Sequence, residues 1–421
     1  MTGYNLRLLQ LRTSDDLRTE LQKIDARSTL LRDQIAQGTW RAVKLERVPV
    51  KLARFLYQEL VLEGGTVALP RLDERIGGVA DVLLLGTTYQ LRHLAIRIRT
   101  QTDGDLDLLA SELTRALDLF DRPLQGTLKI GAAQFQWGSR TYVMGILNVT
   151  PDSFSGDGVI ASSNEFVGRA VERAEELIDD GADILDIGGE STRPGSQPVS
   201  AREELSRVIP VIQAVRRRSR LPISIDTYRG ETASAALDAG ADLVNDVWGL
   251  RMDAEMKRVA AARRAPVVVM HNRSKPKDAV QTDRLGGRYV GVEYTDLMGE
   301  VIRELREQIE LAQDAGIPED KIIVDPGIGF GKTVEQNLEL IDRLGELRVL
   351  GCPILLGPSR KGFIGYTLDL PVQERVEGTA AAIALGIERG VDIVRVHDVK
   401  QMVRVAKMTD AIVRKSKSAN T

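Results

Sequence analysis

The larger part of the chain alternates between short apolar segments and amphipathic segments. Between consecutive apolar runs, the apolar positions follow helical spacing, as they do over residues 203–218. A strand and a helix repeated eight times predict an α/β fold, namely a (β/α)8 TIM barrel over residues 140–415. The eight apolar runs occupy residues 142–150, 183–189, 222–227, 243–249, 267–271, 322–327, 354–360 and 393–398.

The first 125 residues have a different pattern, which predicts a small α+β domain of unknown role. We expect a linker with a hairpin over residues 126–139, where it would close the bottom of the barrel, and a flexible tail over 416–421. A long polar loop is expected over 275–291. In the first domain, helices are expected over 14–24, 51–62 and 105–119, and strands over 5–11, 82–85 and 93–99.

Length and composition exclude several kinds of protein. The 421 residues exceed the roughly 250 of one barrel, which agrees with a second domain. A net charge of -3 gives no reason to expect nucleic-acid binding. The chain has neither a signal-like start nor eighteen uncharged apolar residues in a row, so neither secretion nor a membrane span is expected. The single cysteine, Cys352, is typical of a buried thiol in a cytoplasmic protein.

Polar residues lie near the end of each of the eight apolar runs or directly after it. In a TIM barrel the C-terminal ends of the strands build the active site, so these residues are the candidate site. They are Asn148, Asp186, Glu190, Asp226, Asn245, Asp246, His271, Asp325, Ser359, Arg360, Lys361, Arg395 and His397.

Asp226 and Asp325 follow apolar runs, where a carboxylate without a partner is costly. Together with the amide of Asn245, they suit a flat heterocycle with several N–H donors, such as a 2-amino-4-oxo-pteridine or a guanine. The alternative is structural, with the carboxylates bonded to arginines across the barrel.

Basic residues end the seventh and eighth runs, where barrels often bind phosphate. Arg395 and His397 are two residues apart and therefore point to the same side of a strand. A phosphorylated or pyrophosphorylated substrate is the natural inference. The amide oxygen of Asn148 suits Mg²⁺, and Arg193 in a glycine-rich loop offers a planar donor for an anion.

Two other motifs do not fit their usual roles. The segment 331–333, Gly-Lys-Thr, resembles the end of a P-loop, but Pro326 stands where that motif requires glycine. Three histidines and one cysteine are too few for a catalytic zinc cluster.

Seven segments resemble, in the same order, motifs of the dihydropteroate synthase family. The resemblance spans residues 138–414 and implies a homodimeric (β/α)8 transferase of folate synthesis. Such an enzyme condenses 6-hydroxymethyl-7,8-dihydropterin pyrophosphate with 4-aminobenzoate, releasing pyrophosphate and 7,8-dihydropteroate. The segments are MGILNVTPDSFS (144–155), DIGGESTRPG (186–195), IDT (225–227), ND (245–246), DPGIGFGK (325–332), SRK (359–361) and RVHD (395–398).

The resemblance also implies roles for individual residues. Asn148 would bind Mg²⁺, and Asp226 would compensate positive charge in a dissociative substitution. The pterin would be held by Asp226, Asn245, Asp325 and Lys361. The pyrophosphate would be held by Arg193, Arg395 and His397. The aminobenzoate pocket would be formed by Thr192, Pro194, Phe330 and Ser359. The residues implied to be catalytic are Asp226, Lys361, Arg395 and His397.

The chain departs from the family pattern at two places. Gly362 stands where many relatives carry Ser, and residues 271–274, His-Asn-Arg-Ser, differ from the common Met-containing version. Contacts of pterin and aminobenzoate there stay open. Two alternatives are a pterin-dependent methyltransferase barrel, which has no use for a pyrophosphate site, and a non-catalytic pterin-binding protein.

Overall fold

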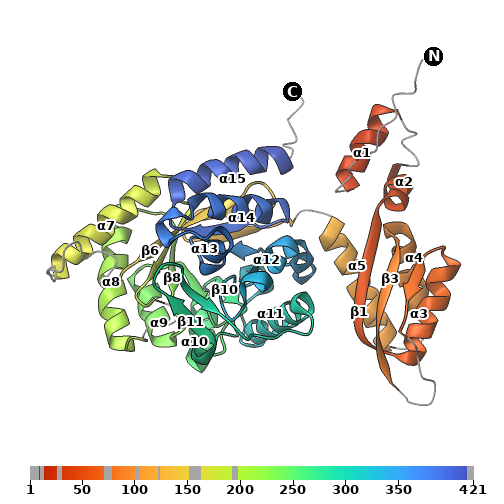
Figure 1. Ribbon diagram of the computed structural model, residues 1–421, viewed down its shortest axis with the longest axis horizontal. Helices are drawn as coiled ribbons and strands as arrows, with labels where there is room; N and C mark the ends of the chain where they lie inside the picture. The colour runs from red at the N-terminus through yellow and green to blue at the C-terminus, as the bar shows by residue number, and fades with distance from the viewer. Residues whose placement is uncertain are drawn as a thin grey trace. The chain divides into compact units, whose positions relative to one another are not determined.

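The structure is a computed structural model that describes residues 9, 14–25, 31–70, 78–100, 104–121, 124–150, 163–191 and 198–414. The chain divides into two compact units, Met1–Arg122 and Pro123–Thr421 (Figure 1). In the described part of the chain, no helix combines the length and the apolar character that a membrane crossing requires.

The second unit is built on eight parallel strands that form a closed ring. Each strand pairs with the next along the chain, β15 returns to β6, and a bridge between Val324 and Ile354 joins β13 to β14. The predicted (β/α)8 barrel is therefore confirmed. The strands are β6 (Tyr142–Asn148), β7 (Ile184–Gly188), β8 (Ile223–Asp226), β9 (Leu243–Asp246), β10 (Val267–Met270), β13 (Ile322–Asp325), β14 (Leu355–Leu356) and β15 (Ile393–Val396).

Helices surround this ring (Figure 1). On α8, the apolar stripe with Val208, Ile212 and Val215 is buried in one core with Ile223 and Ile225 of β8. Full burial of one such side chain stabilises the fold by about 1.5–3 kcal/mol. The helices are α7 (Ser163–Asp179), α8 (Ala201–Arg218), α9 (Gly230–Ala239), α10 (Ala254–Arg263), α11 (Leu297–Asp314), α12 (Val334–Asp342), α13 (Gly362–Leu368), α14 (Val376–Glu388) and α15 (Val399–Val413).

An apolar hairpin closes one end of the barrel. It consists of β4 (Thr127–Ile130) and β5 (Ala133–Gln136), and its side chains share a core with the inward residues at the strand starts. Side chains alternate along a strand, so the residue two positions after an inward residue also points inward. In several strands this second inward residue is polar. Examples are Asn245 after Leu243, Asp325 after Ile323, and Arg395 after Ile393. The polar inward residues therefore gather at the opposite, C-terminal end.

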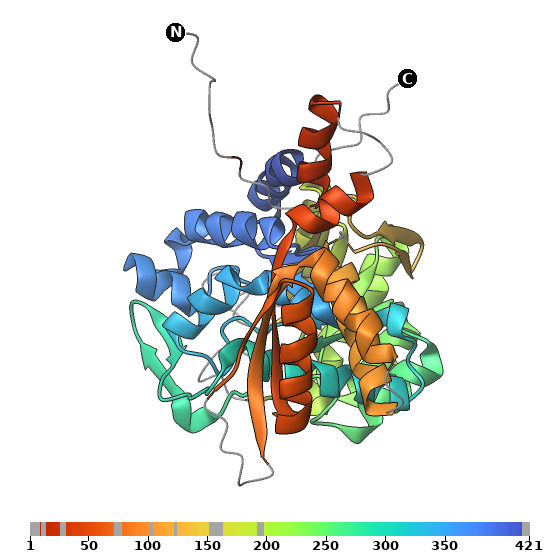
Figure 2. The same ribbon diagram turned by 90° about the vertical axis from the view of Figure 1, so that its right-hand side faces the viewer.

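The first unit contains a three-stranded antiparallel sheet and helices packed on it. The strand order is β1 (Trp40–Pro49), β3 (Val79–Thr87), β2 (Thr66–Ala68). Figure 2 shows α3 running alongside these strands. The core joins Leu56 and Leu60 of α3, Leu84 of β3, Leu94 of α4 and Leu113 of α5. The helices are α1 (Ser14–Lys23), α2 (Leu31–Gly38), α3 (Val50–Leu62), α4 (Thr88–Arg99) and α5 (Gly104–Asp121).

Two sequence predictions need correction. Residues 93–99, predicted as a strand, belong to α4, whose buried stripe begins earlier, at Leu91, and whose first turn is closed by a capping box of Thr87 and Gln90. Residues 275–291 are not only a loop, because they contain the hairpin of β11 (Ala279–Thr282) and β12 (Gly286–Tyr289). The strand predicted over 5–11 lies almost entirely outside the described residues, and the tail at 416–421 lies wholly outside them.

Candidate functional site

A network of buried charges joins four strands at the C-terminal mouth of the barrel. Arg395 of β15 donates from Nε to Asp186 Oδ2 of β7 at 2.6 Å, and from Nη2 to Asp226 Oδ2 of β8. Asn245 of β9 donates from Nδ2 to the same Asp186 oxygen at 3.2 Å. The acidic and amide residues predicted for a heterocycle and the arginine predicted for an anion therefore lie at one rim.

The two carboxylates of this network lie in different environments. Asp186 is fully buried, and within the described residues its Oδ1 has no hydrogen-bond partner. Burial raises the pKa of the Asp226 carboxyl to about 7; Arg395 opposes this shift and Asp186 adds to it. Although burial disfavours the charged form of Arg395, the two aspartates raise its pKa above the usual value. When Asp186, Asp226 and Arg395 are all ionised, the three side chains carry one net negative charge. This charge favours a ligand that donates hydrogen bonds.

Asp325 and Lys361 form a second group beside β13. Asp325 Oδ1 accepts a hydrogen bond from Gly327 N at 2.7 Å, and burial raises the pKa of this carboxyl. Lys361 Nζ donates to the carbonyl of Ile328 and lies 4.5 Å from the centre of the Phe330 ring. Burial lowers the pKa of Lys361 to about 8, and Asp325 opposes that shift. An ammonium, a carboxylate and an aromatic ring are thus close together.

Ser359 and His397 link the loops that follow β14 and β15. Ser359 Oγ lies 3.0 Å from His397 Nδ1 and accepts a hydrogen bond from His397 N at 3.1 Å. Next to them, Arg360 adopts a left-handed backbone with φ of 55° and pairs with Asp398. Ser359, expected in the aminobenzoate pocket, therefore also orients the histidine expected at the pyrophosphate.

Asn148 ends β6 in register with Gly188 of β7, whose neighbour on β8 is Asp226. In the described part of the chain, no group of three or more His, Cys, Asp or Glu could hold a metal ion. The amide oxygen of Asn148 could supply one ligand to Mg²⁺, which usually keeps waters and binds substrate phosphates. This donor set fits Mg²⁺ only when a phosphate-bearing substrate supplies further ligands.

The predicted residues Thr192, Arg193 and Pro194 lie outside the described residues.

Three residues at the strand ends have structural partners. Glu190 pairs with Arg229 at 2.6 Å, and Asp246 accepts hydrogen bonds from two backbone N–H groups of the turn that follows it. His271 is buried against Lys332. Sequence reasoning gave Asp186 no role beyond its place at a strand end. The sequence feature that could have indicated a role for Asp186 is its place as an aspartate in an otherwise apolar strand, where a buried partner is required.

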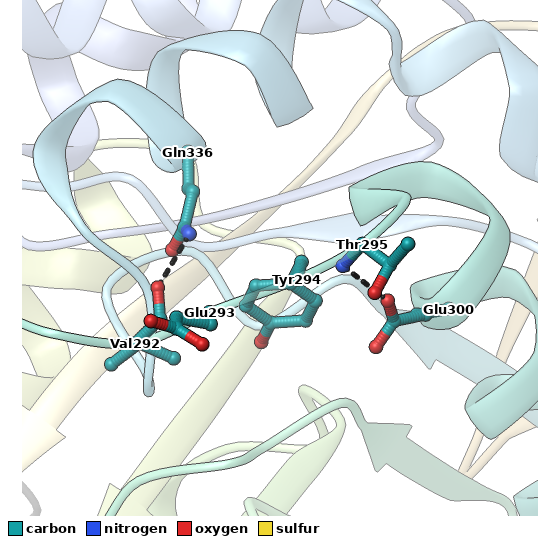
Figure 3. A pocket seen from close by; sticks show the side chains of 6 residues that line it. All are labelled: Val292, Glu293, Tyr294, Thr295, Glu300 and Gln336. Carbon is teal, nitrogen blue, oxygen red and sulfur yellow. Dashed lines mark hydrogen bonds between the residues drawn. The ribbon is translucent and has the colours of Figure 1, made fainter.

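A hollow of about 560 Å³ lies outside this constellation (Figure 3). Two residues of its walls bond to neighbouring segments: Tyr294 Oη donates to Gly331 O of the β13–α12 loop at 3.1 Å, and Gln336 Nε2 of α12 donates to Val292 O at 2.8 Å. None of the predicted site residues lines it. The hollow is therefore separate from the candidate site.

Comparisons with known proteins agree with this geometry. The family model described as "Pterin binding enzyme" matches residues 144–397. The dihydropteroate synthase of Clostridium beijerinckii is 49% identical over 289 residues, which cover 68% of this chain and 100% of that protein. The chain belongs to the dihydropteroate synthase family. It is therefore a transferase, and the predicted resemblance is confirmed.

Solved structures of this family include two from Xanthomonas albilineans. The dihydropteroate synthase with 4-aminobenzoic acid has a TM-score of 0.61 and 40% identity, and covers 68% of this chain and 98% of that one. The complex with 7,8-dihydropteroate has a TM-score of 0.59 and 38% identity over the same shares.

One relative extends over most of both units. The probable bifunctional folylpolyglutamate synthase/dihydropteroate synthase of Haloferax volcanii is 39% identical over 400 residues, covering 93% of this chain and 46% of that protein. The match to the shorter synthase of Clostridium beijerinckii covers 68% of this chain, whereas the match to this longer relative covers 93% and therefore includes much of the first unit.

Proposed function

We propose that the barrel joins 6-hydroxymethyl-7,8-dihydropterin pyrophosphate to 4-aminobenzoate, forming 7,8-dihydropteroate and pyrophosphate. The observation that carries this proposal is the network in which Arg395 joins Asp226 and Asp186 at the barrel mouth. The solved synthases of Xanthomonas albilineans hold 4-aminobenzoic acid in one structure and 7,8-dihydropteroate in another, which supports the same substrate class here.

In this proposal the acidic and amide side chains hold the pterin ring. The carboxylates of Asp226 and Asp325 accept hydrogen bonds from ring and exocyclic N–H groups, and Asn245 offers both a donor and an acceptor. Lys361 donates to acceptors of the ring from the side of Phe330. Buried donors and acceptors discriminate strongly, because a ligand that lacks the matching group leaves them unpaired.

The basic side chains bind the leaving group and shape the second subsite. Arg395, His397 and Arg193 donate to the pyrophosphate, and Ser359 keeps the imidazole of His397 oriented. Mg²⁺, held by Asn148 and by pyrophosphate oxygens, would add positive charge that stabilises the leaving group. The aminobenzoate ring would lie against Phe330, with Ser359, Thr192 and Pro194 completing its pocket.

The chemistry is a dissociative substitution in our proposal. The C–O bond to pyrophosphate breaks and its electron pair leaves with the oxygen, whose charge Arg395 and His397 stabilise. The remaining methylene carries positive charge shared with the pterin ring, and the carboxylate of Asp226 compensates it. The amine of aminobenzoate then forms the C–N bond and releases a proton to solvent. The described site requires no covalent enzyme intermediate for these steps.

We further propose that the protein is a homodimer in the cytoplasm, as the family resemblance implies; sedimentation of the purified chain tests its association state.

A methyltransferase that uses a pterin cofactor would share Asp226 and Asn245. It would have no use for a pyrophosphate site, so Arg395 and His397 beside them disfavour that alternative.

Release of pyrophosphate by the purified chain tests the proposed reaction. We expect release that needs both the dihydropterin pyrophosphate and 4-aminobenzoate, that falls when Mg²⁺ is chelated, and that matches formation of dihydropteroate mole for mole. Binding of the pterin without any turnover would instead favour a non-catalytic pterin-binding protein. Methyl transfer from a methylated folate would favour the methyltransferase.

A further inference from the structure

Lys332, in the segment that superficially resembles a P-loop, has an unusual environment. Its side chain is among the largest that are fully buried, with only 1% of the residue exposed. Burying an ammonium is costly unless it is paired and hydrogen-bonded. Within the described residues no carboxylate forms an ion pair with it; burial lowers the pKa of Lys332 to about 7, and the charged form is hydrogen-bonded by other acceptors.

All three N–H donors of the ammonium have an acceptor. Nζ donates to Gly327 O at 3.1 Å and to Phe330 O at 3.2 Å, and it lies 2.9 Å from His271 Nδ1. The two carbonyls belong to the loop between β13 and α12, whereas His271 follows β10. The loop is therefore wrapped around the ammonium and tied to the neighbouring strand.

The backbone of the loop lies directly against the residues after β10. A Cβ on Gly327, where φ is 70°, would lie 1.8 Å from the carbonyl oxygen of His271. A Cβ on Gly331, where φ is 57°, would lie 2.4 Å from the carbonyl carbon of Arg273. Such close contact leaves the loop little freedom as long as the bonds from Lys332 hold it down.

The imidazole of His271 is fixed in turn. We assign the proton to Nε2, because Nδ1 faces the ammonium. Nε2 lies 3.1 Å from Glu304 Oε2, although the direction is not that of a regular hydrogen bond. Burial lowers the pKa of His271 to about 3, and the nearby Lys332 adds to this effect, so the ring is neutral. Glu304 also pairs with Arg273, which connects the network to α11.

The same loop presents groups to the substrates in the function proposed above, on which this inference rests. Asp325 begins the loop and accepts from Gly327 N, Phe330 lies within it, and Lys361 donates to the carbonyl of Ile328. We propose that Lys332 is a positioning residue whose buried ammonium holds residues 327–331 in the shape that lets Asp325, Phe330 and Lys361 bind pterin and aminobenzoate. It touches neither substrate.

Steady-state kinetics of the full-length chain test this role. Lys332→Met keeps the length of the side chain but removes the three donors and the charge, whereas Lys332→Gln keeps N–H donors without the charge. We expect Lys332→Met to raise KM for both substrates about tenfold or more, the scale of losing a hydrogen bond to a charged group. The rise should be smaller in Lys332→Gln. Lys321→Met is the matched control, because Lys321 precedes β13 at the other end of the strand and donates to the carbonyl of Arg264 there.

A pH measurement separates positioning from loss of stability. Lys332 helps to hold down the pKa of Asp325, which burial raises. Removing this charge should therefore raise the pKa of Asp325. As the pH is lowered, pterin binding, measured by pterin fluorescence, should then fall to half at a higher pH than in the wild type. A variant that is only less stable would show a lower Tm with unchanged KM and an unchanged pH profile. The charged and titratable groups that face Lys332 are Asp325, His271, Arg273, Glu304 and Lys361.

The outcomes distinguish this inference from the proposed function. If the wild-type chain releases no pyrophosphate, the proposed function fails first. If the wild type is active and both Lys332 variants keep wild-type KM values and pH profiles, Lys332 is not a positioning residue. Should Lys332→Met not fold, Lys332→Gln carries the same test. If neither variant folds under conditions where Lys321→Met does, the residue serves the fold as a whole, and the inference is overturned.

Discussion

A few buried charges that compensate one another determine the candidate site at the scale of single residues. Arg395 lies between Asp186 and Asp226, and removing one partner of such a buried pair typically costs about 3–5 kcal/mol. The two aspartates are not equivalent, because the side chain of Asp186 is fully buried while that of Asp226 is 10% exposed. We therefore assign Asp186 to holding the guanidinium and Asp226 to facing the substrate.

Asp226→Asn should lower kcat by about 10²-fold or more, the scale of losing one electrostatic stabiliser of the transition state. The amide keeps the shape of the side chain but cannot compensate the positive charge on the methylene. Single-turnover kinetics with saturating substrates measure the effect. Asp238→Asn on the outer helix α9 is the control, since it removes a carboxylate from an exposed pair with Arg263. Near-wild-type turnover of Asp226→Asn would remove this residue from the mechanism.

The pH dependence of kcat/KM should be bell-shaped. Asp226 acts as a carboxylate, so activity falls as pH drops through the raised pKa of about 7. Lys361 acts as an ammonium, so activity falls as pH rises through the lowered pKa of about 8. Because these groups interact, the two limbs report values for the cluster rather than for either residue. In Lys361→Arg the alkaline limb should move to higher pH, because a guanidinium keeps its charge there; an unmoved limb would assign it to another group.

At the scale of elements, the β11–β12 hairpin is packed against the start of α13. A Cβ on Gly362 would lie 2.3 Å from the carbonyl oxygen of Gly287 in β12. Tyr366 Oη donates to Gly286 O at 3.2 Å, and Arg375 donates to Leu285 O and to Arg360 O, both at 3.0 Å. Glycine at position 362 is thus required by the hairpin, which explains this departure from the family pattern.

Gly362→Ala should lower the free energy of unfolding by about 1–3 kcal/mol, the usual cost of overpacking, and should raise KM as well. The hairpin or the first turn of α13 must move, and Lys361 immediately precedes that turn. Denaturant unfolding and steady-state kinetics measure both effects. Gly168→Ala is the control, because nothing lies within 4 Å of its Cβ position inside α7. Alanine there should be neutral or stabilising by up to about 1 kcal/mol. Equal behaviour of the two variants would contradict the packing argument.

At the scale of the whole molecule, two units share one chain. Each has its own apolar core, one around Leu56, Leu84 and Leu94 and the other around the barrel strands. The described residues of the proposed site all follow residue 140. The reaction is therefore expected to depend on the second unit alone.

Deletion of residues 1–122 should leave an active synthase. The cut follows the boundary at Arg122 and keeps the hairpin of β4 and β5, whose apolar side chains close the barrel. We expect KM and kcat close to those of the full chain, and sedimentation should show whether the association state changes. A folded but inactive truncation would assign the first unit a part in the reaction.

The sequence by itself determined the barrel and the inventory of its mouth. Short continuous apolar runs and the helical stripes between them report local burial, and each run ends where a barrel has its site. The helix α4 was misread because the segment 93–99 alternates by chance, while its buried stripe starts upstream at Leu91. The hairpin β11–β12 was missed because its exposed residues show no apolar alternation.

Only the tertiary structure decided which of these residues meet. Arg395 bonds to Asp186, 209 positions earlier in the chain, and Lys332 lies against His271, 61 positions away. No local pattern contains such pairs, because strand order and the closure of the ring bring them together. Because burying an unpaired charge is costly, each of these groups needs a partner, and the fold determines which residue that partner is.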